Sequence, residues 1–410
     1  MTVPKLRFKG FDKGWEKTTI QSLVDKNILD KPMDGNHGEI HPTAKDYVEN
    51  GIPFVMASDI FDGQVALERS KKIKKQQADS LRKGFALEDD VLLTHKATIG
   101  QVAIVPKLDT PYVMLTPQVT YYRILDKDKL QKKFLKSSFE APYFQEQLKA
   151  LCTGATRQYI GISEQRKLPF SYCDSKEQTK IASFLSAVDD KITQLTQEQE
   201  LLSEYKKGMM QQLFSQNLRF KADDGNEYEG WTLTTLDKYI HESGLKSVTE
   251  NEYEVFTSSR KGLIPQNEYF ENSRLTSREN IGFNIIQSDA ITYRSRSDDG
   301  LFFFNQNTLG RTGIVSTYYP VFNMIAGNNK FLCEYLNFHK YEYVKYAVGT
   351  SQLVLSFSAL KNIVFQMPVV AEQTKIANFL SAIDQKIDNV AAQIDQAKVW
   401  KKGLLQQMFV

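Results

Sequence analysis

The chain has 410 residues, of which 41% are hydrophobic and 25% are charged. A chain of this length is too long to fold around a single hydrophobic core, so we expect two to four globular units. Its composition is ordinary for a globular protein. The sequence has no run of about 18 apolar residues for a membrane span, and its first residues lack the apolar core of a signal peptide. The formal net charge is only +3, with the basic excess in residues 1–170, so any nucleic-acid surface must be local.

The residue types that bind metals or form disulfides are few and unpatterned. Cys152, Cys173 and Cys333 have no paired spacing, so they predict neither a disulfide framework nor a zinc knuckle. The five histidines have no metal-ligand spacing either: His37, His41, His95, His241 and His339. We therefore expect no metal in this chain, and a reducing cytoplasm as its compartment.

Residues 1–170 predict a first globular domain built from short strands. The stretches 52–60, 90–100 and 101–106 have the β-branched and apolar content of strands. Residues 128–151 have the apolar spacing of a helix. The basic run 71–75 is either a solvated face or a phosphate contact.

Residues 171–215 and 367–410 predict two long helices that repeat one another. Residues 177–192, EQTKIASFLSAVDDKI, match residues 372–387, EQTKIANFLSAIDQKI, at 13 of 16 positions. Further on, YKKGMMQQLF matches WKKGLLQQMF at 6 of 10, at the same offset of 195 residues. The twelve positions between them match at none, although apolar residues keep a heptad-like spacing. The two ends therefore have a specific role, whereas the middle need only be helical.

Local signals in these helices support further predictions. Ser175 and Gln178 predict a capping box at the start of the first helix. Gly208 and Gly403 lie at equivalent positions inside the pattern, where glycine costs about 1 kcal/mol relative to alanine. They predict either a close approach of another backbone or a bend.

Residues 216–366 predict a second globular domain of the same texture. Strand-like stretches lie at 254–265, 289–304 and 313–322, and residues 328–347 predict a helix. The motif Leu-Arg-Phe-Lys at residue 6 recurs at residue 218. The order domain, helix, domain, helix indicates a duplicated α+β architecture with pseudo-twofold symmetry. We expect the two apolar seams to pair as an intramolecular antiparallel coiled coil; the alternative is that each helix packs only on its own domain.

With the doubled helix and the strand segments DVLL…TIGQVAIV and ITYRSRSDDG…GIVS, the chain resembles the specificity subunit of type I restriction-modification systems over essentially its whole length. The resemblance implies two target-recognition domains that each read half of a bipartite DNA sequence, and helices that separate them and bind methyltransferase subunits. It implies a non-catalytic subunit. The cofactors S-adenosylmethionine, ATP and magnesium would be bound by the methyltransferase and restriction (motor) subunits, not by this chain.

Motifs for catalysis are absent from the sequence: it has no Asn-Pro-Pro-Tyr or Asp-Pro-Pro-Tyr tetrapeptide and no phosphate loop. For contacts to double-stranded DNA, Arg and Lys suit guanine, and Asn and Gln suit adenine. The candidates are Lys96, Arg157, Gln158, Arg294, Arg296, Arg311 and Gln352. Alternation along a strand places Arg294 and Arg296 on one face, where they either contact DNA or pair with Asp298 or Asp299.

The repeated helix starts are the best candidates for binding a partner. These residues are Glu177, Gln178, Lys180, Phe184, Glu372, Gln373, Lys375 and Phe379. Helix capping and intrachain packing are the alternative explanation of their identity. Two other functions stay open: a stand-alone sequence-specific DNA-binding protein, and a self-contained methyltransferase or nuclease, which the missing motifs disfavour.

Overall fold

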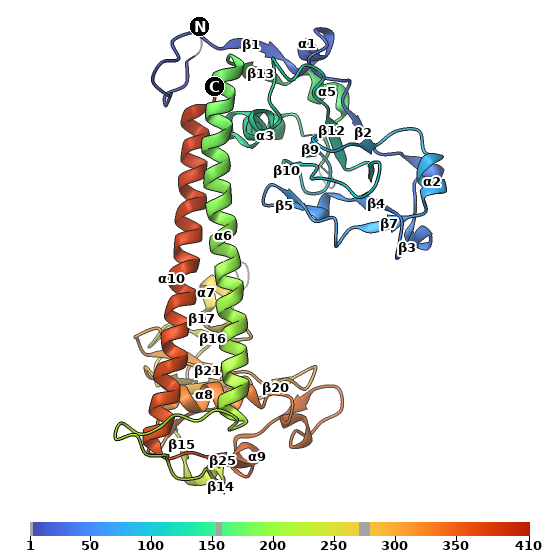
Figure 1. Ribbon diagram of the computed structural model, residues 1–410. Helices are drawn as coiled ribbons and strands as arrows, with labels where there is room; N and C mark the ends of the chain where they lie inside the picture. The colour runs from blue at the N-terminus through green and yellow to red at the C-terminus, as the bar shows by residue number, and fades with distance from the viewer. Residues whose placement is uncertain (1–2, 153–157, 270–278) are drawn as a thin grey trace. The chain divides into compact units, whose positions relative to one another are not determined.

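Residues 3–152, 158–269 and 279–410 are described by the computed structural model of the chain, which forms two compact units (Figure 1). The first unit consists of residues 1–197 with 391–410, and the second of residues 198–390. Each unit therefore combines one globular domain with the beginning of one long helix and the end of the other. The predicted α+β class is confirmed. Within the described residues, no helix is both long and apolar enough to cross a membrane.

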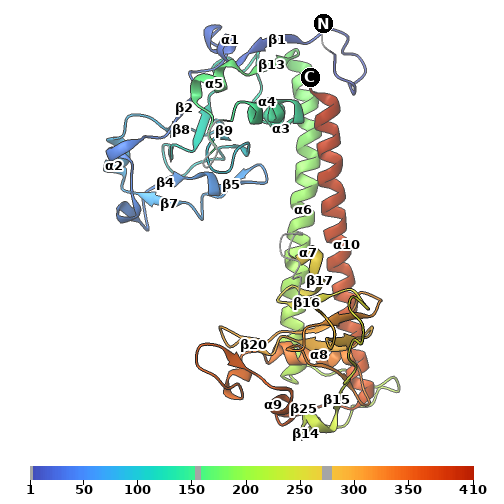
Figure 2. The same cartoon turned by 180° about the vertical axis from the view of Figure 1, so that it is seen from behind.

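The two repeated segments form the long helices α6 (Ser175–Phe214) and α10 (Val370–Met408), which pair antiparallel. In the first unit, the start of α6 lies beside the end of α10, and the rings of Phe184 and Trp400 are 6.0 Å apart (Figure 2). In the second unit, the end of α6 lies beside the start of α10, and Lys206 is 2.7 Å from Asp384. The alternative in which each helix packs only on its own domain is therefore wrong.

The first domain contains two main sheets. One has the order β10 (Val102–Ile104), β9 (Val91–Thr94), β12 (Val119–Tyr122), β2 (Met33–Asp34). The other has the order β3 (Tyr47–Val48), β7 (Lys71–Ile73), β4 (Ile52–Val55), β11 (Val113–Leu115), β8 (Phe85–Ala86). Its β4–β11 pair is parallel, whereas its other pairs are antiparallel. Two smaller pairs are β1 (Glu16–Thr19) with β13 (Pro169–Tyr172) and β5 (Ile60–Phe61) with β6 (Gln64–Val65).

The α-helices of this domain within the described residues are α1 (Ile20–Asp25), α2 (Lys75–Asp79), α3 (Lys132–Glu140), α4 (Pro142–Ala150) and α5 (Ile162–Lys167). The helical prediction for 128–151 is confirmed over most of that range, but the chain breaks between α3 and α4. Ala141 is extended there, with φ −62° and ψ 138°. The following Pro142 causes this, since proline disfavours helical backbone at the residue before it.

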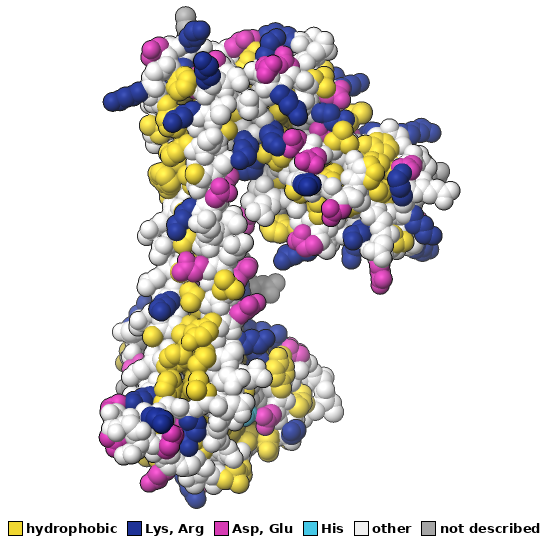
Figure 3. Space-filling view, viewed as in Figure 1, with side chains coloured by type: hydrophobic (Ala, Val, Ile, Leu, Met, Phe, Trp, Pro, Cys, Tyr) yellow, Lys and Arg dark blue, Asp and Glu magenta, His cyan; other side chains and the backbone are white. Residues whose placement is uncertain are grey.

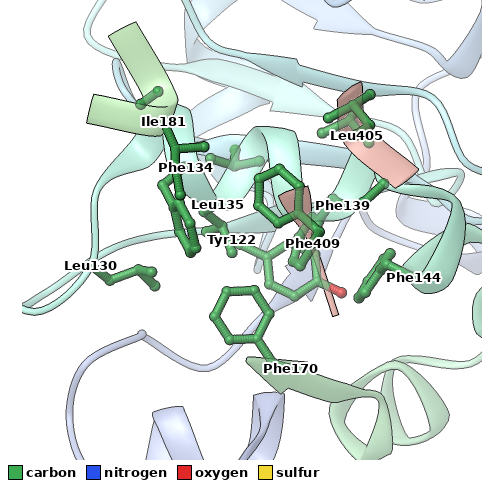
Figure 4. Packing of buried hydrophobic residues seen from close by; sticks show 14 of the residues in the cluster. Tyr122, Leu130, Phe134, Leu135, Phe139, Phe144, Phe170, Ile181, Leu405 and Phe409 are labelled. Carbon is green, nitrogen blue, oxygen red and sulfur yellow. The ribbon is translucent and has the colours of Figure 1, made fainter. Parts of the chain in front are cut away.

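The core of the first unit joins α3 to both long helices (Figure 4). Phe409, from the end of the chain, lies 5.4 Å from Phe134 and 5.9 Å from Trp15, measured between ring centroids. Ile181 of α6 and Leu405 of α10 join the same cluster. Burying one such side chain contributes about 1.5–3 kcal/mol, so the helix ends are part of the domain and not a separate rod.

The second domain has a four-stranded antiparallel sheet in the order β15 (Ile240–Glu242), β23 (Val321–Met324), β19 (Ile291–Tyr293), β21 (Phe304–Gln306). Its two-stranded pairs are β14 (Thr232–Thr235) with β25 (Val364–Met367), β16 (Phe256–Ser259) with β17 (Gly262–Pro265), β18 (Asn284–Ile286) with β22 (Gly313–Val315), and β20 (Arg296–Ser297) with β24 (Leu353–Val354). Its helices are α7 (Gln266–Tyr269), α8 (Asn329–Phe338) and α9 (Phe357–Lys361). The predicted helix at 328–347 is shorter than expected and is followed by a 3₁₀ turn at Tyr343–Lys345.

The predicted capping box is wrong, and the close approach predicted at the two glycines is not made by the described part of this chain. The Asp174 side chain, not a capping box at Ser175, accepts hydrogen bonds from the backbone N–H groups of Lys176 and Glu177. A Cβ placed on Gly208 or Gly403 would meet nothing within 4 Å, so no neighbouring backbone approaches either glycine among the described residues.

Candidate nucleic-acid interface and repeated helix surfaces

The segment from β19 to β20 presents two exposed arginines from a rigid backbone. Arg294 and Arg296 are exposed while Ser295 between them is buried, so the alternation expected from sequence is present. The Ser295 hydroxyl donates to the carbonyl of Tyr318 at 2.6 Å. The buried Tyr293 hydroxyl donates to a backbone carbonyl at 3.0 Å. These bonds fix the direction in which both arginine side chains leave the chain.

Neither arginine is neutralised by a carboxylate within the described part of the chain. The guanidinium of Arg296 instead lies over the ring of Tyr318, at 4.0 Å from the centroid. Asp299 pairs with Arg260, and hydrogen bonds from Arg260 and Ser297 lower the pKa of Asp299 to about 2. The alternative pairing of Arg294 and Arg296 with Asp298 or Asp299 is therefore wrong.

The other two candidates in the second domain already have intrachain partners. Arg311 donates twice to one oxygen of Glu254, at 2.6 and 2.8 Å. The side-chain amide of Gln352 donates to Asp298 Oδ1 at 2.9 Å. A phosphate or base must displace these acceptors to bind either side chain, whereas Arg294 and Arg296 need no such exchange.

In the first domain, Lys96 is half-buried and its backbone bridges that of Tyr159. Gln158 is exposed, and Arg157 lies outside the described residues. In the basic run, Lys75 pairs with Asp79 at 2.6 Å, as expected of a solvated helix face. Figure 3 shows Lys and Arg side chains interspersed with Asp and Glu over both units. On that face, the basic side chains form small groups and not one continuous patch.

A buried polar group lies directly beside Lys96. The imidazole Nδ1 of His95 is 2.9 Å from the Thr120 hydroxyl, and its Nε2 is 3.9 Å from Asp34. Burial lowers the pKa of His95 to about 4 although Asp34 opposes this, so the ring is neutral at pH 7. His95 therefore adds no positive charge beside Lys96. Among the described residues, no group of three His, Cys, Asp or Glu could hold a metal ion.

Four of the eight repeated partner candidates serve the fold itself. Glu177 and Glu372 are almost completely buried and form two-pronged ion pairs with Arg7 and Arg219. The buried side chains of Gln178 and Gln373 hydrogen-bond backbone groups of the adjoining domain, at the positions of Gln131, Lys129, Cys173, Asn328 and Pro368. Side chains so buried cannot reach a partner, so intrachain packing explains their identity.

The other four candidates line the surface of the helix starts. Lys180 and Phe184 lie against Phe8, at 5.7 Å each, and Phe379 lies 5.5 Å from the equivalent Phe220. Lys375 pairs with Asp223 at 2.6 Å. These side chains are exposed or half-buried and remain available to a second protein.

Two further repeated sets were not among the predicted sites. In the first unit, Lys401 bridges Glu140 and Asp189, which also pair with Lys136. In the second unit, Lys206, Glu334, Asp384 and Lys330 form the same arrangement. The identity of Asp189 with Asp384 and of Lys401 with Lys206 in the repeat was the signal for these pairs. We call the two arrangements the charge clusters.

The second set consists of identical, outward-facing residues near the helix ends: Lys207, Gly208, Gln211 and Gln212 on α6, and Lys402, Gly403, Gln406 and Gln407 on α10. All are exposed except Gly403, which is half-buried. Within the described residues, none of their side chains makes a hydrogen bond or an ion pair. We call these the helix-end surfaces. Their sequence signal was the repeated KKG-x-x-QQ motif.

Comparison with known proteins gives a consistent result. The sequence model described as "Type I restriction modification DNA specificity domain" matches residues 12–203 and 246–399. The specificity subunit of the type I restriction enzyme MjaIX from Methanocaldococcus jannaschii is 24% identical over 401 residues, covering 89% of this chain and 87% of that protein. The MjaVIII specificity subunit of the same organism is also 24% identical, over 68% of this chain and 66% of that protein.

Solved structures share the fold. The type I restriction-modification S subunit from M. genitalium aligns with a TM-score of 0.56 at 18% identity, over 100% of this chain and 99% of that one. A chain from a structure on complex assembly and conformational transition of the type I R-M system aligns with a TM-score of 0.53 at 15% identity, over 97% of this chain and 98% of that chain.

Proposed function

Since the chain belongs to the family of type I restriction-modification DNA specificity domains, we propose that its two globular domains read the two halves of a bipartite DNA target. As a specificity subunit it recognises a DNA sequence and is not the catalytic component. The two domains differ in sequence and in sheet order, so the target is asymmetric.

We further propose that the chain positions methyltransferase subunits, one on each compact unit, and through them a restriction subunit. The helix-end surfaces carry this proposal. Packing and ion pairs explain identities such as Glu177, Gln178 and Asp189. They do not explain exposed residues such as Lys207, Gln211 and their equivalents. A stand-alone DNA-binding protein has no use for these two identical surfaces.

The glycines indicate how the partner approaches. Glycine in an exposed helix interior costs about 1 kcal/mol relative to alanine, and nothing in the described chain occupies the space beside Gly208 or Gly403. A partner backbone packed against the helix at these points offsets that cost. Each unit then offers one helix-end surface together with the helix-start residues: Lys180 and Phe184 with Gly403 in the first unit, and Lys375 and Phe379 with Gly208 in the second.

The cofactors belong to the partners in this proposal. S-adenosylmethionine is bound by the methyltransferase subunits, and ATP and magnesium by the restriction subunits. The assembly acts on DNA in the cytoplasm. A reaction containing this chain, a cognate methyltransferase subunit, S-adenosylmethionine and genomic DNA is expected to methylate only when both proteins are present. Methylation by this chain alone would contradict the proposal.

The docking surface is tested by filling the glycine positions. Gly208→Gln and Gly403→Gln are each expected to raise helix stability by up to about 1 kcal/mol, because the glycine penalty is removed. Each is also expected to remove one of two bound methyltransferase subunits, and the double variant to remove both, as measured by co-purification and mass.

The matched control is Ala392→Gln, which places the same side chain at an exposed position in the unmatched middle of α10. It should leave the stoichiometry unchanged. If the glycine variants bind as many methyltransferase subunits as the wild type, the helix-end surfaces are not the docking site.

A further inference from the structure

The second domain holds Arg296 at a well-defined place in its backbone. The residue before it, Ser295, donates its N–H to the carbonyl of Tyr318 at 3.3 Å and accepts the N–H of Leu355 at 2.9 Å. Arg296 itself is paired with Val354 of β24. Residues 295 and 296 therefore lie between two segments that are distant in sequence, one at Tyr318 and one at Val354 and Leu355. The Arg296 side chain is exposed at this place.

The first domain has the same arrangement of backbone hydrogen bonds, made by different residues. His95 donates its N–H to the carbonyl of Gln118 at 2.9 Å and accepts the N–H of Ile160 at 3.0 Å. The next residue, Lys96, is bridged to Tyr159. Tyr159 and Ile160 are separated from Val354 and Leu355 by the repeat offset of 195 residues. Lys96 is thus the structural equivalent of Arg296, and Gln118 that of Tyr318.

The two equivalent places differ in what they can bind. Arg296 presents a planar fork, held over the Tyr318 ring at 4.0 Å from its centroid. An arginine stacked in this way loses little entropy on binding, and its fork fits O6 and N7 of guanine. Lys96 presents a single ammonium group, and Gln118 takes the place that Tyr318 has in the second domain. Ala97, which follows it, has φ +68°, an unusual backbone conformation for a residue with a side chain.

We propose that Lys96 and Arg296 occupy one duplicated base-contact position, through which each domain reads a base pair of its own half-site. Arg296 takes guanine through two parallel hydrogen bonds in the major groove, and Lys96 makes a single-donor contact in the other half-site. The inference rests on the DNA recognition that is part of the proposed function, and it assigns that recognition to residues.

Arg311 and Arg260 are poorer candidates for base contact than Arg296. Arg311 is held by Glu254 and Arg260 by Asp299, so each must lose an ion pair before it can bind a guanine. Both are more than half exposed and share the charge of Arg296, but not its lack of a carboxylate partner among the described residues. Arg260, which is not among the candidate DNA contacts, is therefore a matched control for the loss of one positive charge.

The test uses the complex of the full chain with its methyltransferase subunit, and it sequences the methylated sites in genomic DNA. Arg296→Gln is expected to lower the preference for one base pair in one half-site by about 5- to 150-fold, the range for one two-pronged contact. The other half-site should be unchanged, which shows that the protein is folded. Lys96→Gln is expected to relax one base pair in the opposite half-site. Arg296→Lys keeps the charge but loses the fork, so it should relax the same base pair as Arg296→Gln.

Arg260→Gln should leave both half-sites unchanged. The inference is overturned if Arg296→Gln weakens methylation equally at all sites, as loss of a phosphate contact would, or if the motif does not change. Selection of bound sequences from random DNA by the purified full chain serves as a second readout. If the wild-type chain binds DNA sequence-selectively but does not bind methyltransferase, the proposed assembly is refuted. The same selection, repeated with the variants, would still show whether residues 96 and 296 determine the preferred base pairs.

Discussion

At the scale of single residues, identity in the repeat has two separate causes. Glu177 and Glu372 are identical because each is a buried carboxylate that needs its arginine, and Trp231 Nε1 adds a further hydrogen bond to Glu372 at 3.0 Å. Gly208 and Gly403 are identical without any such internal requirement. Burial divides the repeated residues into those that hold the chain together and those available to a partner.

Loss of the buried carboxylate charge should destabilise the first unit. In Glu177→Gln, Arg7 loses its ionic partner, and breaking a buried pair costs roughly 3 kcal/mol. Urea denaturation followed by tryptophan fluorescence measures the change. Glu198→Gln, at an exposed position on the same helix, is the control and should be within about 0.5 kcal/mol of wild type. Equal effects of the two substitutions would mean that the ion pair does not stabilise the unit.

At the scale of elements, the charge clusters join three segments in each unit. In the first unit, Lys136 and Glu140 come from α3, Asp189 from the start of α6, and Lys401 from the end of α10. The pKa of Asp189 is lowered: burial opposes its ionisation, but Lys136 and Lys401 outweigh burial. Each long helix therefore carries an aspartate near one end that pairs with a lysine of the other helix.

The charge cluster predicts a pH dependence of stability. The folded pKa of Asp189 is below the ordinary value of 3.8, so its contribution is complete above about pH 4 and is lost as the pH falls through the folded pKa. The pKa of Lys401 is raised above 10.5 by Glu140 and Asp189 against the opposing effect of burial. Its contribution is complete below about pH 10.5 and is lost as the pH rises further.

Asp189→Asn should therefore flatten the loss of stability below about pH 4, as measured by thermal unfolding from pH 2 to 7. Asp190→Asn, an exposed neighbour, is the control. The role given to the cluster would be refuted if the wild type and Asp189→Asn lost stability in parallel over this range.

At the scale of the whole molecule, each long helix begins in one compact unit and ends in the other. The unmatched middle segments 193–204 and 388–399 are the parts where the helices pass from one unit to the other. The two segments share the heptad-like spacing of apolar residues, but no residue is identical between them. This is expected of a spacer, whose length matters more than its side chains.

Helix length should accordingly set the spacing of the two half-sites. A seven-residue insertion in each middle segment adds about 10.5 Å of helix, or roughly three base pairs of DNA, and keeps the heptad pattern. Sequencing of methylated sites should then show the same half-sites with a longer spacer. A substitution of seven residues without insertion is the control. An unchanged spacer in the insertion variant would exclude this role of the helices.

The duplicated architecture, the expectation of antiparallel pairing and the resemblance to the family could all be inferred from the sequence, because they depend on apolar periodicity and on a long internal repeat. The sequence also placed Arg294 and Arg296 on one face, since alternation along a strand is a local rule. It did not predict the break at Ala141, where the local effect of Pro142 interrupted an otherwise helical pattern.

Three-dimensional contacts were needed to show that Glu177 is buried while Lys207 is exposed, and that Arg311 has a carboxylate partner while Arg296 has none among the described residues. Burial and ion pairing are set by residues distant in the chain: Arg7 reaches Glu177, Glu254 reaches Arg311, and Tyr318 lies under Arg296. The residue-by-residue equivalence of Lys96 with Arg296 likewise comes from backbone hydrogen bonds. Non-local contacts of this kind leave no periodic signal in a single sequence.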